Sequence, residues 1–117
     1  VVVVGRRTAE LEGYRQIRVR EEFQVVRVAA GLAPEPALVI VDRSGPSLDT
    51  IVSEHGPRVQ LEAGITLHTV LAERITRVWL SHAPVVVGDH GAAFAGTLPP
   101  LRERWISADY VVSRFEY

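Results

Sequence analysis

The sequence predicts a two-layer α+β fold, in which a largely antiparallel sheet carries one long helix over residues 66–79 and some shorter helices. Short β-branched runs recur along the chain, and most are separated by turn residues in stretches too short for a crossover connection. Residues 66–79 are the clearest case of helical spacing of apolar side chains. The length of 117 residues indicates a single domain, residues 1–117.

The first thirty residues contain a clear strand and an ambiguous stretch. Val1–Val4 is an apolar β-branched run that stops at Gly5, which is typical of a buried strand. Residues 15–29 largely alternate apolar and polar side chains, which favours β structure. A helix within residues 8–31 is the alternative, because Thr8 is followed by acidic residues that suit a first turn.

The middle of the chain is predicted to hold short elements joined by turns. Ala37–Val41 is the clearest strand, and a turn over residues 43–46 follows it. Residues 48–53 suit either a returning strand or a short helix, and residues 58–61 a short alternating strand.

The last third is predicted to be mostly strand after the helix at residues 66–79, for which Thr66 is a plausible N-cap. A tight turn at residues 88–91 between two apolar runs predicts a hairpin. The further elements expected are strands at 84–87, 92–96 and 109–115, with a loop or short helix from 97 to 105.

A parallel α/β fold is the rival architecture. It requires residues 8–31 and 46–56 both to be helical, so that each strand-to-strand link is a crossover. The apolar residues of 8–31 scatter around a helical wheel, which favours the antiparallel interpretation.

Composition removes several classes of function. The chain has no Cys, and all 13 of its basic residues are Arg, so thiol, Schiff-base and P-loop lysine chemistry are excluded. A formal net charge of −1 gives no general attraction to nucleic acid or an anionic membrane, and no partner of either kind is predicted. Without a membrane-spanning run or a signal peptide, the expected location is cytoplasmic.

The four histidines provide candidates for acid–base chemistry but no metal site. His82 and His90 lie at opposite ends of the strand expected at 84–87, which is too far apart to share one ion. His90 follows Asp89, and His55 follows Glu54. Either acid–His pair is a candidate for general acid–base catalysis, and the alternative is an ordinary turn residue facing solvent.

Arg74 is the charge whose position suggests a ligand. On a helix over residues 66–79 it would fall within the apolar arc, where a buried guanidinium must be paired. We expect Arg74 to bind an anionic ligand, with His68 on the same side. Alternatively, Arg74 extends to solvent or pairs with a structural acid such as Asp42, which ends the strand 37–41 and is itself a candidate ligand residue.

A basic and aromatic cluster near the end of the chain is a further candidate surface. Arg102, Arg104 and Trp105 could stack on a base or contact a partner peptide, although the near-neutral charge argues against nucleic acid.

The sequence also resembles two known families. The run Ala37–Gly45, residues 48–56, the helix 66–79 and the segment Ala83–Asp89 resemble a GAF-type ligand-sensing domain, which implies a regulatory ligand-binding fold. The chain departs from that family in residues 1–5 and 8–31.

Residues 61–101 are similar to the core of diadenylate cyclase domains. The family's Asp-Gly-Ala triplet is absent where Ser81–Ala83 stands, and only Arg102-Glu103-Arg104 remains of its Arg-His-Arg. That resemblance therefore implies a protein without cyclase activity.

The expected function is non-enzymatic binding of a small anionic or nucleotide-like ligand by a regulatory domain, with no cofactor. The alternatives are a small enzyme that uses one of the acid–His pairs, and a dimeric interaction module. In the latter, the strand 1–4 or 109–115 would pair across a homodimer.

Overall fold

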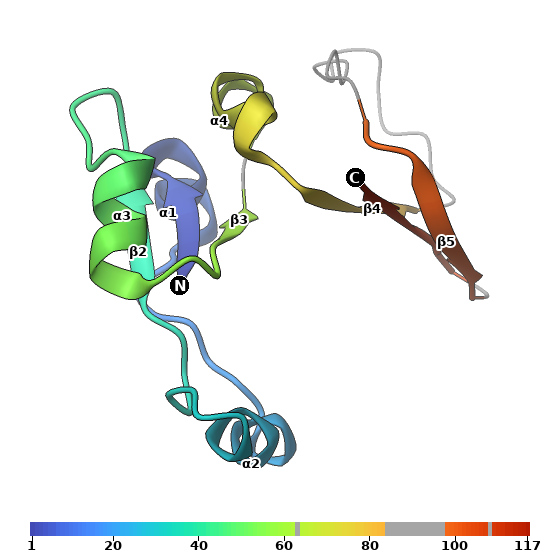
Figure 1. Ribbon diagram of the computed structural model, residues 1–117, viewed down its shortest axis with the longest axis horizontal. Helices are drawn as coiled ribbons and strands as arrows, with labels where there is room; N and C mark the ends of the chain where they lie inside the picture. The colour runs from blue at the N-terminus through green and yellow to red at the C-terminus, as the bar shows by residue number, and fades with distance from the viewer. Residues whose placement is uncertain (63, 84–97, 108) are drawn as a thin grey trace. The chain divides into compact units, whose positions relative to one another are not determined.

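The computed structural model describes residues 1–62, 64–83, 98–107 and 109–117, and the chain divides into two compact units, Val1–Gly64 and Ile65–Tyr117 (Figure 1). The elements of the first unit are β1 (Val2–Gly5), α1 (Arg6–Glu12), α2 (Glu21–Ala29), β2 (Leu38–Val41), α3 (Leu48–His55) and β3 (Gln60–Glu62). Those of the second are α4 (Ile65–Leu71), a 3-10 turn η1 (Ala72–Arg74), β4 (Arg77–His82), β5 (Leu101–Ile106) and β6 (Val111–Glu116). The single domain expected from length stays a prediction.

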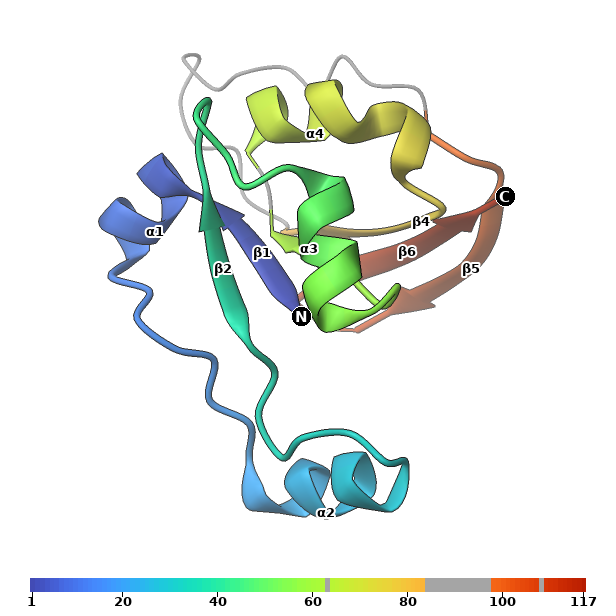
Figure 2. The same ribbon diagram turned by 60° about the vertical axis from the view of Figure 1, so that its left-hand side comes forward.

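The first unit is built on a parallel sheet of order β2-β1-β3. The connection from β1 to β2 moves to one side of β1, and the connection from β2 to β3 crosses back over it. Because such crossovers are right-handed, α1, which follows β1, and α3, which follows β2, must lie on opposite faces of the sheet. Figure 2 shows α1 and α3 on the two sides of β1 and β2.

The core of this unit surrounds β1, which is covered on both faces. Val2, Val3 and Val4 are 4%, 1% and 1% exposed, as expected of a continuous apolar run in a parallel sheet. Ala9 of α1 and Ile51 of α3 are also buried. The prediction of a strand at residues 1–4 is therefore confirmed, as is the one at 37–41, which is β2.

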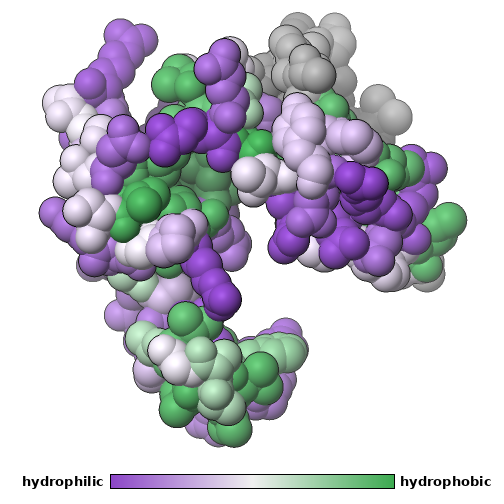
Figure 3. Space-filling view, in the orientation of Figure 1, coloured by the Kyte–Doolittle hydropathy of each residue, from purple (hydrophilic) through white to green (hydrophobic). Residues whose placement is uncertain are grey.

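The β structure expected for residues 15–29 is wrong, because residues 21–29 form the helix α2. Its local signals outweigh the alternating pattern: Glu21 and Glu22 lie in the first turn, Arg27 in the last, and Gly31 follows at φ +73°. In the described part of the chain, no strand lies beside residues 21–29 to supply a ladder of hydrogen bonds. In the space-filling view, apolar side chains gather over this helix (Figure 3); they include Phe23, Val25, Val26 and Val28, each more than half exposed.

The remaining ambiguity of the first unit, at residues 48–53, is resolved by a helix cap. Residues 48–55 are helical, with Ser47 as the N-cap whose side chain accepts a hydrogen bond from the Thr50 amide. The turn predicted at 43–46 is present, closed by hydrogen bonds between Asp42 and Gly45. With helices in both long connections, residues 1–64 adopt the parallel architecture that the sequence analysis considered as the rival.

The second unit has an antiparallel sheet of order β4-β6-β5, so the strand predicted at 109–115 is confirmed as β6. The single long helix predicted at 66–79 is wrong. Helical structure ends in η1, and β4 begins at Arg77. Val78 and Leu80 are half-buried while their neighbours are exposed, and the alternation of a strand replaces helical spacing once β6 provides hydrogen bonds.

Residues 101–106 form β5, so the loop or short helix expected there is wrong. The predicted hairpin with strands at 84–87 and 92–96 lies outside the described residues. The molecule is a mixed α/β protein with two sheets, and its sheets are not wholly antiparallel. None of the helices in the described part of the chain is long and apolar enough to cross a bilayer.

Candidate functional site

The carboxyl ends of β1 and β2 form the best candidate site. The chain leaves β1 toward the face covered by α1, and it leaves β2 toward the face covered by α3 (Figure 2). In open α/β sheets, ligands bind outside the carboxyl ends of the strands, near the point where neighbouring strands send their connections to opposite faces.

An ion pair joins the carboxyl ends of β1 and β2. Arg6 is the first residue after β1, and its guanidinium pairs with the carboxylate of Asp42, the first residue after β2. The Arg6 side chain remains 63% exposed, while that of Asp42 is 19% exposed. The cation is therefore available to solvent on one side of a fixed carboxylate.

Ser44 keeps the Asp42 carboxylate in place and ionised. Its hydroxyl and its backbone amide donate to Asp42 Oδ1 at 2.6 and 2.7 Å. These hydrogen bonds, and then the charge of Arg6, lower the pKa of Asp42 below its ordinary value. The carboxylate can accept further hydrogen bonds from ligand hydroxyl groups.

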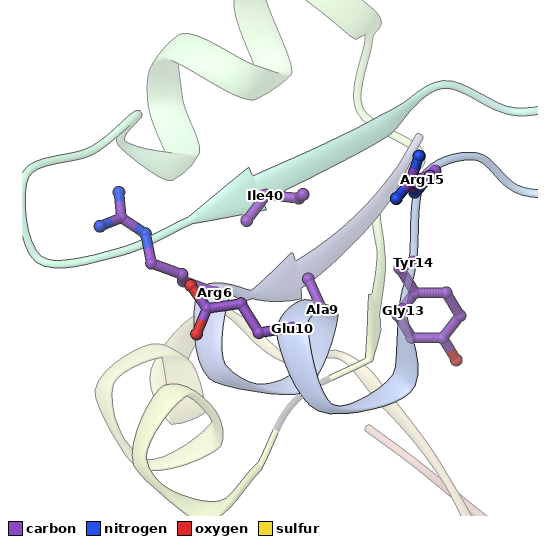
Figure 4. A pocket seen from close by; sticks show the side chains of 7 residues that line it. All are labelled: Arg6, Ala9, Glu10, Gly13, Tyr14, Arg15 and Ile40. Atoms are coloured by element: carbon purple, nitrogen blue, oxygen red, sulfur yellow. The ribbon is translucent and has the colours of Figure 1, made fainter.

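A shallow groove of about 400 Å³ leads away from Arg6 between α1 and β2 (Figure 4). Arg6 and Glu10 lie near one end, Tyr14 and Arg15 near the other, and Ala9 and Ile40 line it between them. Ile40 is 43% exposed, so the groove has an apolar side with a cation at each end.

Tyr14 connects α1 with the other edge of the sheet. Its hydroxyl donates to Glu62 Oε2 at 2.9 Å, which raises the pKa of Tyr14 above its ordinary value. By the register of the sheet, Glu62 lies beside Val4, which in turn lies beside Ile40. The hydrogen bond therefore secures the chain just after α1 against the face that carries the groove.

The residues predicted to bind a ligand are divided between the two units. Asp42 belongs to the first unit, and Arg74 and His68 belong to the second. Arg74 ends η1 and is exposed, so the buried helical arc on which its selection depended does not exist. His68 lies on α4 and is half-buried. The partner of Asp42 is Arg6, and a ligand role for Arg74 and His68 stays a prediction.

The acid–His pairs have different outcomes. Glu54 and His55 lie at the end of α3 with 3.9 Å between Glu54 Oε2 and His55 Nε2, longer than a hydrogen bond. Since α3 runs back along the sheet, this pair lies at the edge opposite Asp42. Asp89 and His90 lie outside the described residues. Catalysis by either pair stays a prediction. Among the described residues, no three His, Cys, Asp or Glu side chains lie close enough to bind a metal ion.

The three residues of the predicted basic and aromatic cluster, Arg102, Arg104 and Trp105, each contact other partners. Trp105 stacks on Trp79, with ring centroids 5.4 Å apart and an interplanar angle of 15°. The guanidinium over Trp79 is that of Arg114, 6.0 Å from the ring centroid, and not that of Arg102 or Arg104. Arg102 Nε donates to the backbone carbonyl of Glu116.

The sequence analysis missed Arg6, Ser44 and Tyr14. A strand followed at once by a helix, with an acid at the end of the next strand, is the signal that would have found Arg6. This signal was hidden once residues 15–29, which follow α1, were interpreted as β structure. Ser44 and Tyr14 carry no sequence signal of their own, because each matters only through its partner.

Comparisons with known proteins support the fold alone. No protein-family model matches the chain, and no curated protein sequence matches it. The structure is similar to that of a pyrimidine reductase-like protein from Corynebacterium diphtheriae, with a TM-score of 0.80 and 14% identity, over 98% of this chain and 74% of the other.

This similarity corrects both resemblances drawn from the sequence. Neither the GAF-type nor the diadenylate cyclase assignment is supported, because the matched fold is that of the reductase-like protein. Those resemblances depended on apolar strands and turns, which many α/β folds share. At 14% identity the chain shares that protein's fold.

Proposed function

We propose that the first unit binds a small anionic, nucleotide-like ligand at the carboxyl ends of β1 and β2. The observation that carries this proposal is the exposed Arg6 guanidinium, which lines the groove along α1 and is held beside the ionised Asp42 carboxylate.

The two groups suit the two polar parts of a nucleotide. A guanidinium donates paired hydrogen bonds to phosphate or carboxylate oxygens. A carboxylate at the end of the second strand of a β-α-β unit accepts hydrogen bonds from ribose hydroxyls in dinucleotide-binding folds. The chain lacks their glycine-rich loop, since Gly5 is followed directly by Arg6 and Arg7. Binding therefore depends on side chains rather than on a backbone cradle.

The groove along α1 gives the ligand's base an apolar surface. Ile40 and Ala9 form its lining beside Arg6. The description of the structural neighbour as pyrimidine reductase-like makes a pyrimidine nucleotide the first class to test. A reductase-like fold suits binding and catalysis alike. We therefore propose ligand binding without a regulatory, non-enzymatic role.

The test is calorimetric titration with uridine monophosphate, uridine and inorganic phosphate. We expect the nucleotide to bind more tightly than either fragment. Arg6→Gln should weaken nucleotide binding by about 10-fold or more, the typical effect of losing a charge-assisted hydrogen bond.

Arg7→Gln is the matched control, because Arg7 is the next residue of α1, is exposed and makes no ion pair with the described residues. It should change the affinity less than about twofold. Equal losses in the two variants would show that only overall charge matters. No binding of uridine monophosphate at millimolar concentration would also contradict the proposal.

A further inference from the structure

A second concavity of the first unit, about 380 Å³ in volume, lies on the α1 face near the amino ends of the strands. Val2 begins β1, Gln60 begins β3, and Pro36 lies just before β2; all three line it. The opposite wall comes from residues 17–20 and from α2. This concavity shares no lining residue with the groove at Arg6, and β1 runs from Val2 at the concavity to Gly5, just before Arg6.

Three arginines line this second concavity: Arg18, Arg20 and Arg27. Within the described part of the chain, none of them has a carboxylate close enough for an ion pair. Arg27 is oriented by its own hydrogen bonds, since Nε donates to the carbonyls of Ala33 and Pro34 at 2.9 and 3.1 Å. Its two terminal nitrogens therefore remain available to a ligand.

One acid lines the same concavity, and its charge is already engaged. The Glu62 carboxylate accepts hydrogen bonds from the Tyr14 hydroxyl at 2.9 Å and from the side-chain amide of Gln60 at 3.3 Å. Three cations against one carboxylate leave the concavity positive, although the whole chain has a formal net charge of −1. A local excess of positive charge of this kind attracts and retains an anion.

Apart from Gln60, the rest of the lining is apolar, and it includes an aromatic ring. Ile17, Val19 and Pro36 are half-buried, and Phe23 of α2 is 56% exposed. An exposed phenyl ring beside guanidinium groups suits a ligand with a flat ring and an attached acid group. The volume falls in the usual range for small-molecule sites.

We infer that this concavity is a second ligand site, which takes an aromatic organic anion of about mononucleotide size between Phe23 and the three arginines. The inference goes beyond the proposed function, because the second site uses neither Arg6 nor Asp42 and no residue of the groove beside Arg6. A ligand could occupy either site without the other.

The probe is 1-naphthyl phosphate, which combines a flat ring with a dianionic group. Its binding to the whole chain is measured by calorimetric titration. We expect it to bind at least about 10-fold more tightly than 1-naphthol, which lacks the charge, or inorganic phosphate, which lacks the ring. The double variant Arg18→Gln/Arg20→Gln should lose about 10-fold in affinity. Phe23→Ala should lose about fivefold.

The matched control is Arg7→Gln/Arg58→Gln, which removes the same charge from two exposed arginines that do not line the concavity. It should change the affinity less than about twofold. Far-UV circular dichroism verifies that each variant is folded, which we expect because none of the four arginines is in an ion pair with the described residues.

Three results would overturn the inference. The first is equal loss in the test and control double variants. The second is binding of 1-naphthol as tight as that of the phosphate, which would show a merely apolar surface. The third is that Arg6→Gln loses affinity for the probe while Arg18→Gln/Arg20→Gln does not. That result would mean that the probe binds beside Arg6 and Asp42 instead. Failure of uridine monophosphate to bind at Arg6 would leave the present inference standing.

Discussion

The two sheets of this molecule use apolar residues in opposite ways. In the parallel sheet of the first unit, three consecutive valines of β1 are almost completely buried, because helices cover both faces. In the antiparallel sheet of the second unit, all six residues of β5 are exposed, and Trp79 and Trp105 stack while about half exposed. A continuous apolar run and an alternating one therefore indicate different environments, even in strands of similar length.

The functional consequence follows from the direction of the strands. Parallel strands place all their carboxyl ends at one edge, so Arg6 and Asp42 meet although they are 36 residues apart in sequence. Antiparallel strands distribute their ends between both edges. The charged residues of the second unit accordingly form pairs across neighbouring strands, such as Arg77 with Glu116 and Arg114 with Glu103.

The largest expected effect compares two isoleucines under the same substitution. Ile51 of α3 is 2% exposed, whereas Ile106 of β5 is 79% exposed. Ile51→Ala should lower the free energy of unfolding by about 2–5 kcal/mol, through lost burial and a residual cavity. Ile106→Ala should change it by less than about 0.5 kcal/mol. Urea denaturation measures both. A loss of similar size in Ile106→Ala would mean that β5 is covered in solution, and the contrast between the sheets would fail.

An intermediate effect is expected for the stacked tryptophans of the second unit. A double-mutant cycle with Trp79→Ala and Trp105→Ala should give a coupling of about 1 kcal/mol, because the rings interact beyond their loss of exposed surface. The exciton signal of the stacked indoles in circular dichroism should vanish in either single variant. Additive losses of stability would show that the two rings act independently.

The smallest effect concerns pH, and it compares one carboxylate from each unit. Hydrogen bonds from the neutral donor groups of Ser44 lower the pKa of Asp42. A hydrogen bond from the charged Arg77 guanidinium lowers the pKa of Glu116. Both groups therefore stabilise the folded chain above their unfolded pKa values, about 3.9 for Asp and 4.3 for Glu. This stability is lost as the pH falls through the lower folded values. Asp42→Asn and Glu116→Gln should each flatten the acid limb of stability against pH.

Salt should separate the two carboxylates. At about 1 M salt the Debye length is about 3 Å, so the attraction between Arg77 and Glu116 is screened, while the neutral Ser44 donors still act on Asp42. NMR titration should show the pKa of Glu116 rising toward its ordinary value more than that of Asp42. An equal rise would mean that the charge of Arg6, rather than Ser44, dominates at Asp42.

Several elements were predictable because their signals are local. The valine run of β1, the strand before Asp42, the turn that follows it and the apolar centre of β6 each depend on adjacent residues. Composition alone also excludes cysteine and lysine chemistry, since a chain without Cys or Lys cannot use those side chains whatever its fold. The candidate site was predictable only at Asp42, as a polar residue at the end of a strong strand.

Other features depended on contacts that sequence patterns do not contain. Residues 21–29 alternate like a strand but are helical, and residues 75–80 have helical spacing but include the start of a strand. In each case the choice depended on whether a neighbouring strand supplies hydrogen bonds, which is a tertiary condition. The placement of Arg6 against Asp42 and of three arginines around one concavity was decided in the same way. The sequence by itself determined which residues could be buried and which chemistry is possible, and the tertiary structure decided which of those residues meet.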